Sequence, residues 1–167
     1  MATLCTEAQR VTAFTDDLIR AAVRAGQYSD AAAEAHLASV LIKRRDKIGR
    51  TYLPAINPII DPRLDGTGAL TFDNAAVRAG FAEAPAKYRA VWSRFDNAAG
   101  TSQRITETES ATTSMTAPRD LPNAAGSFIQ IDISAESAAN PSWREPVHVY
   151  FRRAASGLTL VGLERMP

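Results

Sequence analysis

The spacing of apolar residues changes at Pro54, and this change constrains the fold of the 167-residue chain more than any other feature. Before Pro54, apolar residues recur at steps of three and four, as on one face of a helix. After residue 68 they alternate with polar residues, as on a strand that buries one face. The sequence therefore predicts an α+β protein, with an N-terminal helical pair followed by an antiparallel Ig-like or fibronectin-like β-sandwich. The expected parts are a helical segment over 1–53, a linker or turn over 54–68 and a β-sandwich domain over 69–167.

Two helices are expected in the N-terminal segment, and a short third one over 7–12. The first begins after Thr15, a good N-cap residue, and ends at Gly26. Its expected apolar stripe comprises Leu18, Ile19, Ala22, Val23 and Ala25. The second begins after Ser29 or Asp30 and ends at Pro54. Its expected buried face comprises Leu37, Val40, Leu41, Ile48 and Tyr52.

Short β-like runs separated by turn signals fill the rest of the chain. The expected strands lie within 69–77, 87–97, 102–110, 127–135, 146–153 and 158–165, and the last two should form a hairpin. The stretch 110–123 has no clear pattern and is expected to be a crossing loop. No helical pattern separates these strands, which favours an antiparallel arrangement.

Composition and charge narrow the class of protein. The formal net charge is +1, which argues against a dedicated nucleic-acid binder. No apolar run of about 18 residues and no signal-peptide pattern is present, so a soluble chain without a membrane segment is expected, and its compartment is left open. The lone cysteine, Cys5, cannot form an internal disulfide.

The stretch DPRLDGTGALTFDN, residues 61–74, has the rhythm of a calcium-binding loop. If Asp65 takes the third position of an EF-hand, Arg63 takes the first and Asn74 the twelfth, where carboxylates are needed, so an EF-hand is not expected. One alternative is a looser calcium site built from Asp61, Asp65 and Asp73 with backbone carbonyls. The other, which the composition favours, is a glycine-rich turn entering a strand.

His148 and Asp132 are the candidate catalytic residues, because neighbouring strands could bring a histidine and a carboxylate together as a general base. Glu145 is an alternative partner for the histidine, and a purely structural histidine is the favoured alternative. No serine stands in a glycine-flanked elbow, and no histidine–cysteine cluster has zinc spacing.

The basic run IKRRDKIGR, residues 42–50, has two interpretations. It could contact phosphates or an acidic partner surface. The interpretation that the near-neutral chain favours is a solvated helix face with local ion pairs to Asp46 and Glu34.

Three stretches carry a resemblance: AFTDDLIRAAVRAGQYSDAAAEAHLASVLIKRRDKIGRTYLPAINPI, YRAVWSRFDNAAG and PVHVYFRRAASGLTLVGLER. They resemble the C-terminal region of a group of large uncharacterised bacterial proteins, in which the pattern FTDxxIRAxVxxG leads to RRDKIGR. RRDKIGR, residues 44–50 here, is the most distinctive part. The resemblance implies a C-terminal module cut from a longer parent, and it supplies no catalytic residues.

Two functions are therefore expected. The first is a non-catalytic accessory or interaction module of a larger bacterial protein. Its partner would be another protein or the missing N-terminal portion of the parent, and a homodimer is a further expectation because unpartnered helices expose apolar surface. The alternative is a small calcium-assisted hydrolase of esters or lactones, so whether the chain is an enzyme is left open.

Overall fold

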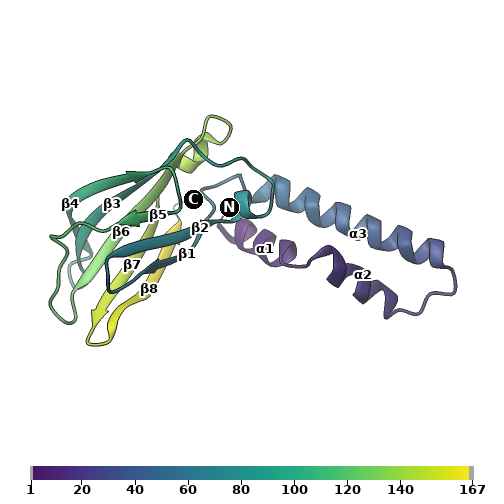
Figure 1. Cartoon of the computed structure of the whole chain (residues 1–167), viewed down its shortest axis with the longest axis horizontal. Helices are drawn as coiled ribbons and strands as arrows, with labels where there is room; N and C mark the ends of the chain where they lie inside the picture. The colour runs from purple at the N-terminus through teal and green to yellow at the C-terminus, as the bar shows by residue number, and fades with distance from the viewer. Residues whose placement is uncertain (1, 166–167) are drawn as a thin grey trace.

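The computed structural model describes residues 2–165, with side chains from residue 7 onward (Figure 1). Three helices, α1 (Ala2–Thr12), α2 (Asp16–Arg24) and α3 (Ala31–Tyr52), form an arm that extends from a body of strands. α1 and α2 follow one another outward along the arm, and α3 returns antiparallel to them. The coarse prediction of an α+β fold is confirmed. The Cys5 side chain lies outside the described residues.

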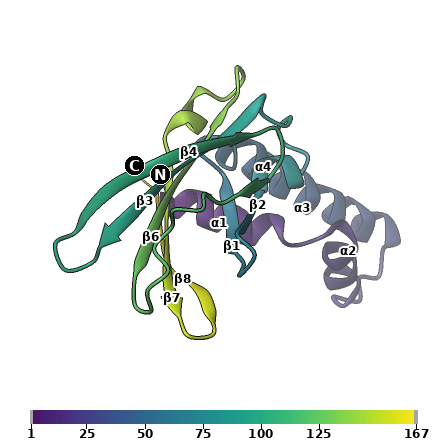
Figure 2. The same ribbon diagram turned by 60° about the vertical axis from the view of Figure 1, so that its left-hand side comes forward.

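Two antiparallel sheets make up the body (Figure 2). The three-stranded sheet has the order β1-β2-β5, with β1 at Ile59–Leu64, β2 at Ala69–Asn74 and β5 at Ser114–Thr116. The five-stranded sheet has the order β4-β3-β6-β7-β8, with β3 at Lys87–Asp96, β4 at Thr101–Ser110, β6 at Phe128–Glu136, β7 at Val147–Ala154 and β8 at Gly157–Arg165. A short helix α4 (Ala75–Arg78) follows β2, and a 3₁₀ turn η1 (Pro141–Arg144) precedes β7.

The predicted alternation along the strands is confirmed by burial. Every second residue of β3, β6 and β7 points into the core, which includes Trp92, Ile131 and Val149 at 0% exposure. The residues between them lie on the outer face of the five-stranded sheet, and of these Asp132 and His148 are half-buried. The predicted hairpin of the last two strands is also present, as the pair β7–β8.

Two local predictions on strands and loops are wrong: the stretch 54–68 contains the strand β1, and the stretch 110–123 contains β5. The strand expected within 69–77 is present as β2, which ends at Asn74 where α4 begins. The first prediction failed because Pro62 is unusual in a strand. It is tolerated here because β1 is an edge strand with a bulge at this point, where Asp61 adopts a φ of 51°.

The predicted helix starts are confirmed, because Thr15 accepts a hydrogen bond from Leu18 N at 3.2 Å and Asp30 accepts one from Ala32 N at 2.8 Å. α2 ends at Arg24, two residues before the expected Gly26. None of the helices within residues 2–165 is long and apolar enough to cross a membrane.

The predicted buried face of α3 is wrong at two of its five positions: Leu37, Val40 and Tyr52 are half-buried, and Tyr52 packs against the core, but Leu41 and Ile48 are exposed. The helix buries Ala38 and Gly49, while Leu41 is 38% and Ile48 is 36% exposed. A Cβ added to Gly49 would lie 2.2 Å from the Phe81 ring and 2.8 Å from the Thr12 methyl group. Close packing of α1 and of the Phe81 loop on α3 therefore requires a glycine here.

Asn57 joins the arm to the body. Its side chain is buried, and Nδ2 donates to the carbonyl oxygens of Ile133 and Glu145, both at 2.9 Å, and of Trp143 at 3.3 Å. The Trp143 ring returns a bond from Nε1 to the carbonyl oxygen of Pro54 at 3.0 Å. The segment that follows α3 is thereby tied to β6 and to the η1 region.

Replacing Asn57 with alanine is expected to lower the free energy of unfolding by about 2–3 kcal/mol, because buried carbonyl oxygens lose their donor. Chemical denaturation measures this loss. The matched control is Asn97→Ala in the exposed turn after β3, which should change stability by less than about 0.5 kcal/mol. Equal stabilities of the two variants would contradict the role of Asn57 as a joint.

Candidate functional site

Asp65, at the centre of the predicted calcium loop, holds its own turn. Its Oδ1 accepts hydrogen bonds from Thr67 Oγ1 at 2.7 Å and from the backbone N–H groups of Thr67 and Ala69, both at 2.9 Å. The bond from the Thr67 hydroxyl, followed by that from Ala69 N–H, lowers the pKa of the Asp65 carboxyl. The carboxylate acts as the cap of a turn between β1 and β2.

Asp61 and Asp73 lie at the other end of the same hairpin. Both approach Arg78, whose Nη1 is 3.5 Å from Asp61 Oδ2 and 2.8 Å from Asp73 Oδ2. Asp65 follows the end of β1, four residues after Asp61, and four residues of a strand span about 13 Å. Among the described side chains, no group of three or more His, Cys, Asp or Glu residues could hold a metal ion. The geometry gives the three carboxylates no common position, and calcium at this turn stays a prediction.

The structure does bring His148 and Asp132 together. They are cross-strand neighbours on β7 and β6, and His148 Nδ1 lies 2.6 Å from Asp132 Oδ1. Gln130 Nε2 donates to the same Asp132 oxygen at 2.7 Å, and the Ser102 hydroxyl donates to Gln130 Oε1. With Nδ1–H held by the carboxylate, the lone pair of His148 Nε2 has no hydrogen-bond partner in the described chain, so this nitrogen could accept a proton. Glu145, the alternative partner, lies in the segment that Asn57 contacts.

Tyr150 and Glu164 border this pair on the outer face. The Tyr150 hydroxyl donates to Glu164 Oε2 at 3.4 Å, and its ring lies 4.9 Å from that of Phe95. Burial, reinforced by the charge of Glu164, raises the pKa of Tyr150, so the phenol stays protonated at neutral pH. No described serine, threonine or cysteine side chain hydrogen-bonds to His148. The face thus offers a base beside a hydrogen-bond donor, without a nucleophile bound to that base.

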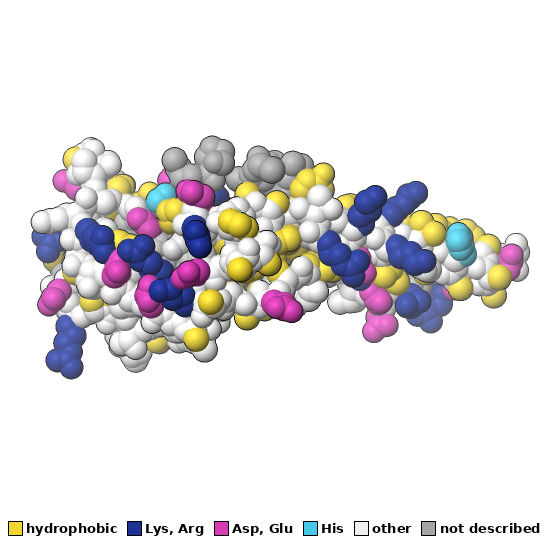
Figure 3. All heavy atoms as spheres, turned by 90° about the horizontal axis from the view of Figure 1, so that it is seen from above, with side chains coloured by type: hydrophobic (Ala, Val, Ile, Leu, Met, Phe, Trp, Pro, Cys, Tyr) yellow, Lys and Arg dark blue, Asp and Glu magenta, His cyan; other side chains and the backbone are white. Residues whose placement is uncertain are grey.

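A different kind of surface lies on the arm. Five of the seven large apolar side chains that are exposed within the described chain belong to it: Phe14 (53%), Leu18 (50%), Tyr28 (47%), Leu41 (38%) and Ile48 (36%). Seen from above, the arm shows hydrophobic side chains beside a group of Lys and Arg side chains (Figure 3). The body, by contrast, exposes only Leu160 and Val161 among its described large apolar residues.

On both α2 and α3 the exposed apolar residues of the arm lie one position before the inward-facing residues. On α3 the outward line Leu37, Leu41, Arg44 and Ile48 advances by four, three and four residues, and all but the half-buried Leu37 are exposed. On α2 the exposed residues Leu18 and Ala22 advance by four, and Phe14, just before the cap of the helix, extends this line by the same step. Inward-facing residues come one position later in both helices: Ala38, Arg45 and Gly49 on α3, and Ile19 and Val23 on α2.

Successive residues of a helix are rotated by 100° about its axis, so on both helices the outward line lies 100° from the inward line, on the N-terminal side of the rotation. Because α2 and α3 are antiparallel (Figure 1), this rotation places both outward lines on the same side of the pair. We call this side the arm flank; it comprises Phe14, Leu18, Ala22, Leu37, Leu41, Arg44 and Ile48.

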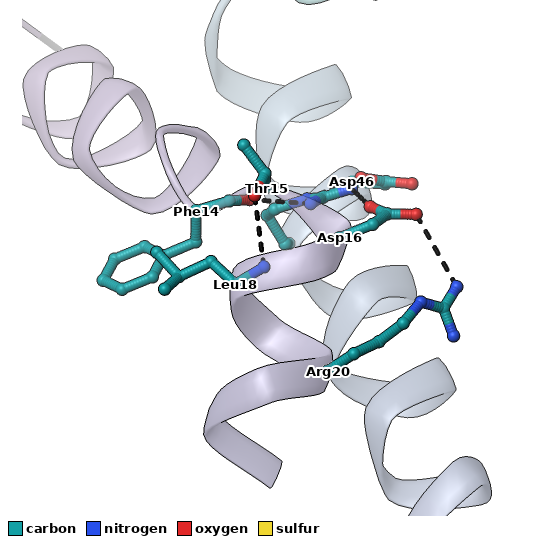
Figure 4. Close-up of polar contacts among 7 residues, drawn as sticks. Phe14, Thr15, Asp16, Leu18, Arg20 and Asp46 are labelled. Atoms are coloured by element: carbon teal, nitrogen blue, oxygen red, sulfur yellow. Dashed lines mark hydrogen bonds and ion pairs between the residues drawn. The ribbon is translucent and has the colours of Figure 1, made fainter. Parts of the chain in front are cut away.

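Arg45 orients the arm flank by holding the start of α2 against α3. Figure 4 shows its partners Phe14, Asp16 and Asp46 side by side at this place. Its Nη1 donates to the carbonyl oxygen of Phe14 at 2.7 Å, its Nη2 pairs with Asp16 Oδ1 at 2.6 Å, and its Nε donates to Asp46 Oδ1 at 2.9 Å. Burial alone would lower the pKa of Arg45, but its bonds to Asp46 and Asp16 raise it, so the guanidinium remains charged. The predicted ion pair with Asp46 is present, although it belongs to the inward side of the helix.

Sequence reasoning treated Leu41 and Ile48 as core and Leu18 as part of a buried stripe, and so missed the arm flank. The signal that could have revealed it is the width of the apolar arc. Apolar residues cover both the inward line and the line one residue before it, which is more than a helix needs to contact one neighbour.

Arg45→Lys is expected to loosen α2, because a single ammonium cannot reach three acceptors in the geometry of a guanidinium fork. The free energy of unfolding is expected to fall by about 1–2 kcal/mol. The backbone amides of α2 should exchange hydrogen faster than those of the body. Arg44→Lys, at the exposed neighbouring position, is the control and should leave exchange unchanged. Unaltered exchange in the Arg45 variant would show that the guanidinium does not hold the helix.

No protein-family model, curated protein or solved structure matched the chain, so the resemblance to large bacterial proteins stays a prediction.

Proposed function

We propose that this chain is a non-catalytic interaction module of a larger bacterial protein, in which the body holds out the arm so that the arm flank binds a protein partner. The observation that carries the proposal is the concentration of exposed large apolar side chains on the arm. Apolar surface gathered on one side of a projecting element is a feature of protein-binding surfaces. The same proposal includes the finer fold assignment, a helical segment over 1–53 attached to an Ig-like or fibronectin-like sandwich.

The polar contacts of the arm support a function in which the arm presents the arm flank to a partner. Arg45 and the cap at Thr15 hold α2 in place, so the arm flank is presented on ordered backbone. An ordered surface loses less conformational entropy on binding than a flexible one. The exposed apolar residues contribute little to the core of the arm itself, and the arrangement favours a role for them in docking.

Site-specific photo-crosslinking tests the proposal in the organism that makes the protein. A benzophenone amino acid at Leu41, within the arm flank, is expected to give a defined covalent adduct with a protein. The same amino acid at Arg24, which is exposed on the opposite side of α2, is the control. No adduct from position 41, or the same adducts from both positions, would overturn a docking role for this surface.

A second candidate function is hydrolysis of esters or lactones with His148 as general base, and the 2.6 Å contact between His148 and Asp132 favours it. A positioned histidine base contributes about 10²–10⁴-fold to such a reaction. If the chain hydrolyses p-nitrophenyl acetate or a simple lactone, His148→Ala should lower the rate by about that factor. Asp132→Asn should lower it as well, with stability intact. His36→Ala, at an exposed position on α3, is the control, and equal rates in all variants would exclude this function.

A further inference from the structure

We propose that the partner of the arm flank is the arm flank of a second copy of this chain, and that the two α3 helices pack antiparallel across a two-fold axis level with residue 39. This inference rests on the proposed docking function and names the partner of the same surface. It follows from the apolar spacing, the unpaired charges and the small residue at the level of the axis.

The apolar residues fit this register. Leu37 and Leu41 lie two residues on either side of position 39 on the outward line of α3. A two-fold axis at this level places Leu37 of one copy opposite the partner's Leu41, and the reverse pair forms on the other side of the axis. Because a two-fold interface uses the same surface twice, Leu37 and Leu41 each find an apolar neighbour.

The charges fit the same register. Arg44 lies five residues after position 39 and Glu34 five residues before it, so Arg44 of one copy faces the partner's Glu34. Glu34 precedes Leu41 by seven residues and therefore borders the arm flank. Within one helix the two residues are about 15 Å apart, too far to pair. Neither makes an ion pair with any side chain of the described chain, so both are available to a second copy.

α2 also allows the close approach of two arms. The bond between Asp16 and Arg45 shows which residues of α2 and α3 lie level with each other. Because antiparallel helices rise equally per residue, the residue of α2 level with position 39 is Ala22. Its small, exposed side chain would meet its own copy at the axis without obstructing the leucines.

The size of the surface suits a dimer of moderate strength. An interface centred on position 39 reaches Ile48 at one end and, by symmetry, residue 30 at the other, which makes it about 27 Å long, and two adjacent helices make it about 20 Å wide. Such a footprint corresponds to the lower end of specific interfaces, about 600 Å² per partner. The product would be a four-helix bundle in which the leucines form a central layer and two Arg44–Glu34 pairs flank it.

Light scattering and sedimentation of the purified chain test the inference when the charges at positions 34 and 44 are reversed in separate variants. The wild-type chain is expected to have twice the 18.0 kDa mass of one copy. Arg44→Glu and Glu34→Arg should each weaken the dimer about tenfold or more, because each places two like-charged pairs across the axis. An equimolar mixture of the two variants should dimerise again, since every cross-axis pair then joins opposite charges.

Two further variants keep the test decisive. Leu41→Ser should weaken the dimer without unfolding an exposed position, and Arg24→Glu, on the opposite side of α2, should leave it unchanged. Circular dichroism checks that each variant is folded. A monomeric mixture, or a wild-type dimer insensitive to Arg44→Glu and Leu41→Ser, would overturn the register.

Failure of this inference is distinguishable from failure of the proposed function. A wild-type monomer at high micromolar concentration that still cross-links from position 41 to a different protein would overturn self-pairing and retain the docking function. A monomer with no such adduct would overturn both.

Discussion

The side-chain amide of Asn57 lies where the chain leaves the arm and enters the body, and it donates to carbonyl oxygens from β6 and the η1 region. Because it is buried, water cannot replace these bonds, and the two parts of the chain are tied at this point. The Trp143–Pro54 bond adds a second tie. A helix that is fixed at one end and antiparallel to its neighbours can project from a body while keeping its direction. The orientation of every residue farther along the arm depends on this joint.

The arm has few large residues in its interior. Its inward positions are occupied by Ile19, Val23, Ala38 and Gly49, which bury little apolar area for helices of this length. Isolated helices of such lengths are marginally stable, so other interactions must contribute. Arg45 supplies one by joining α3 to the start of α2. Association of two arms would supply another, because binding to the folded state stabilises it by mass action.

Much of the body could be predicted from sequence because period-2 patterns are local. Ile129, Ile131 and Ile133 alternate with polar residues, and this alone fixes which face is buried. The contact between His148 and Asp132 could only be suggested from sequence, because strand register depends on pairing across 16 residues. The face of α3 could not be predicted, because the decisive residue is Gly49. Its missing Cβ determines which side of α3 meets α1. A pattern of hydrophobic residues does not show that a neighbouring helix packs closely against a glycine.

Two copies of such a chain could associate through the edges of the five-stranded sheet or through the arm flank, and these two surfaces differ in sequence. The edges of the five-stranded sheet are poor templates for strand addition: β4 is polar except for Ile105, and β8 is interrupted by a bulge at Val161. Near the β4 edge, Arg89 and Lys87 are already paired with Glu107 and Glu109. The arm flank has no comparable protection, because Arg44 within it and Glu34 at its border are unpaired within the described chain and Leu37 and Leu41 lie between them. The edges of the five-stranded sheet thus carry features that oppose pairing with a second copy, and the arm flank carries none of them.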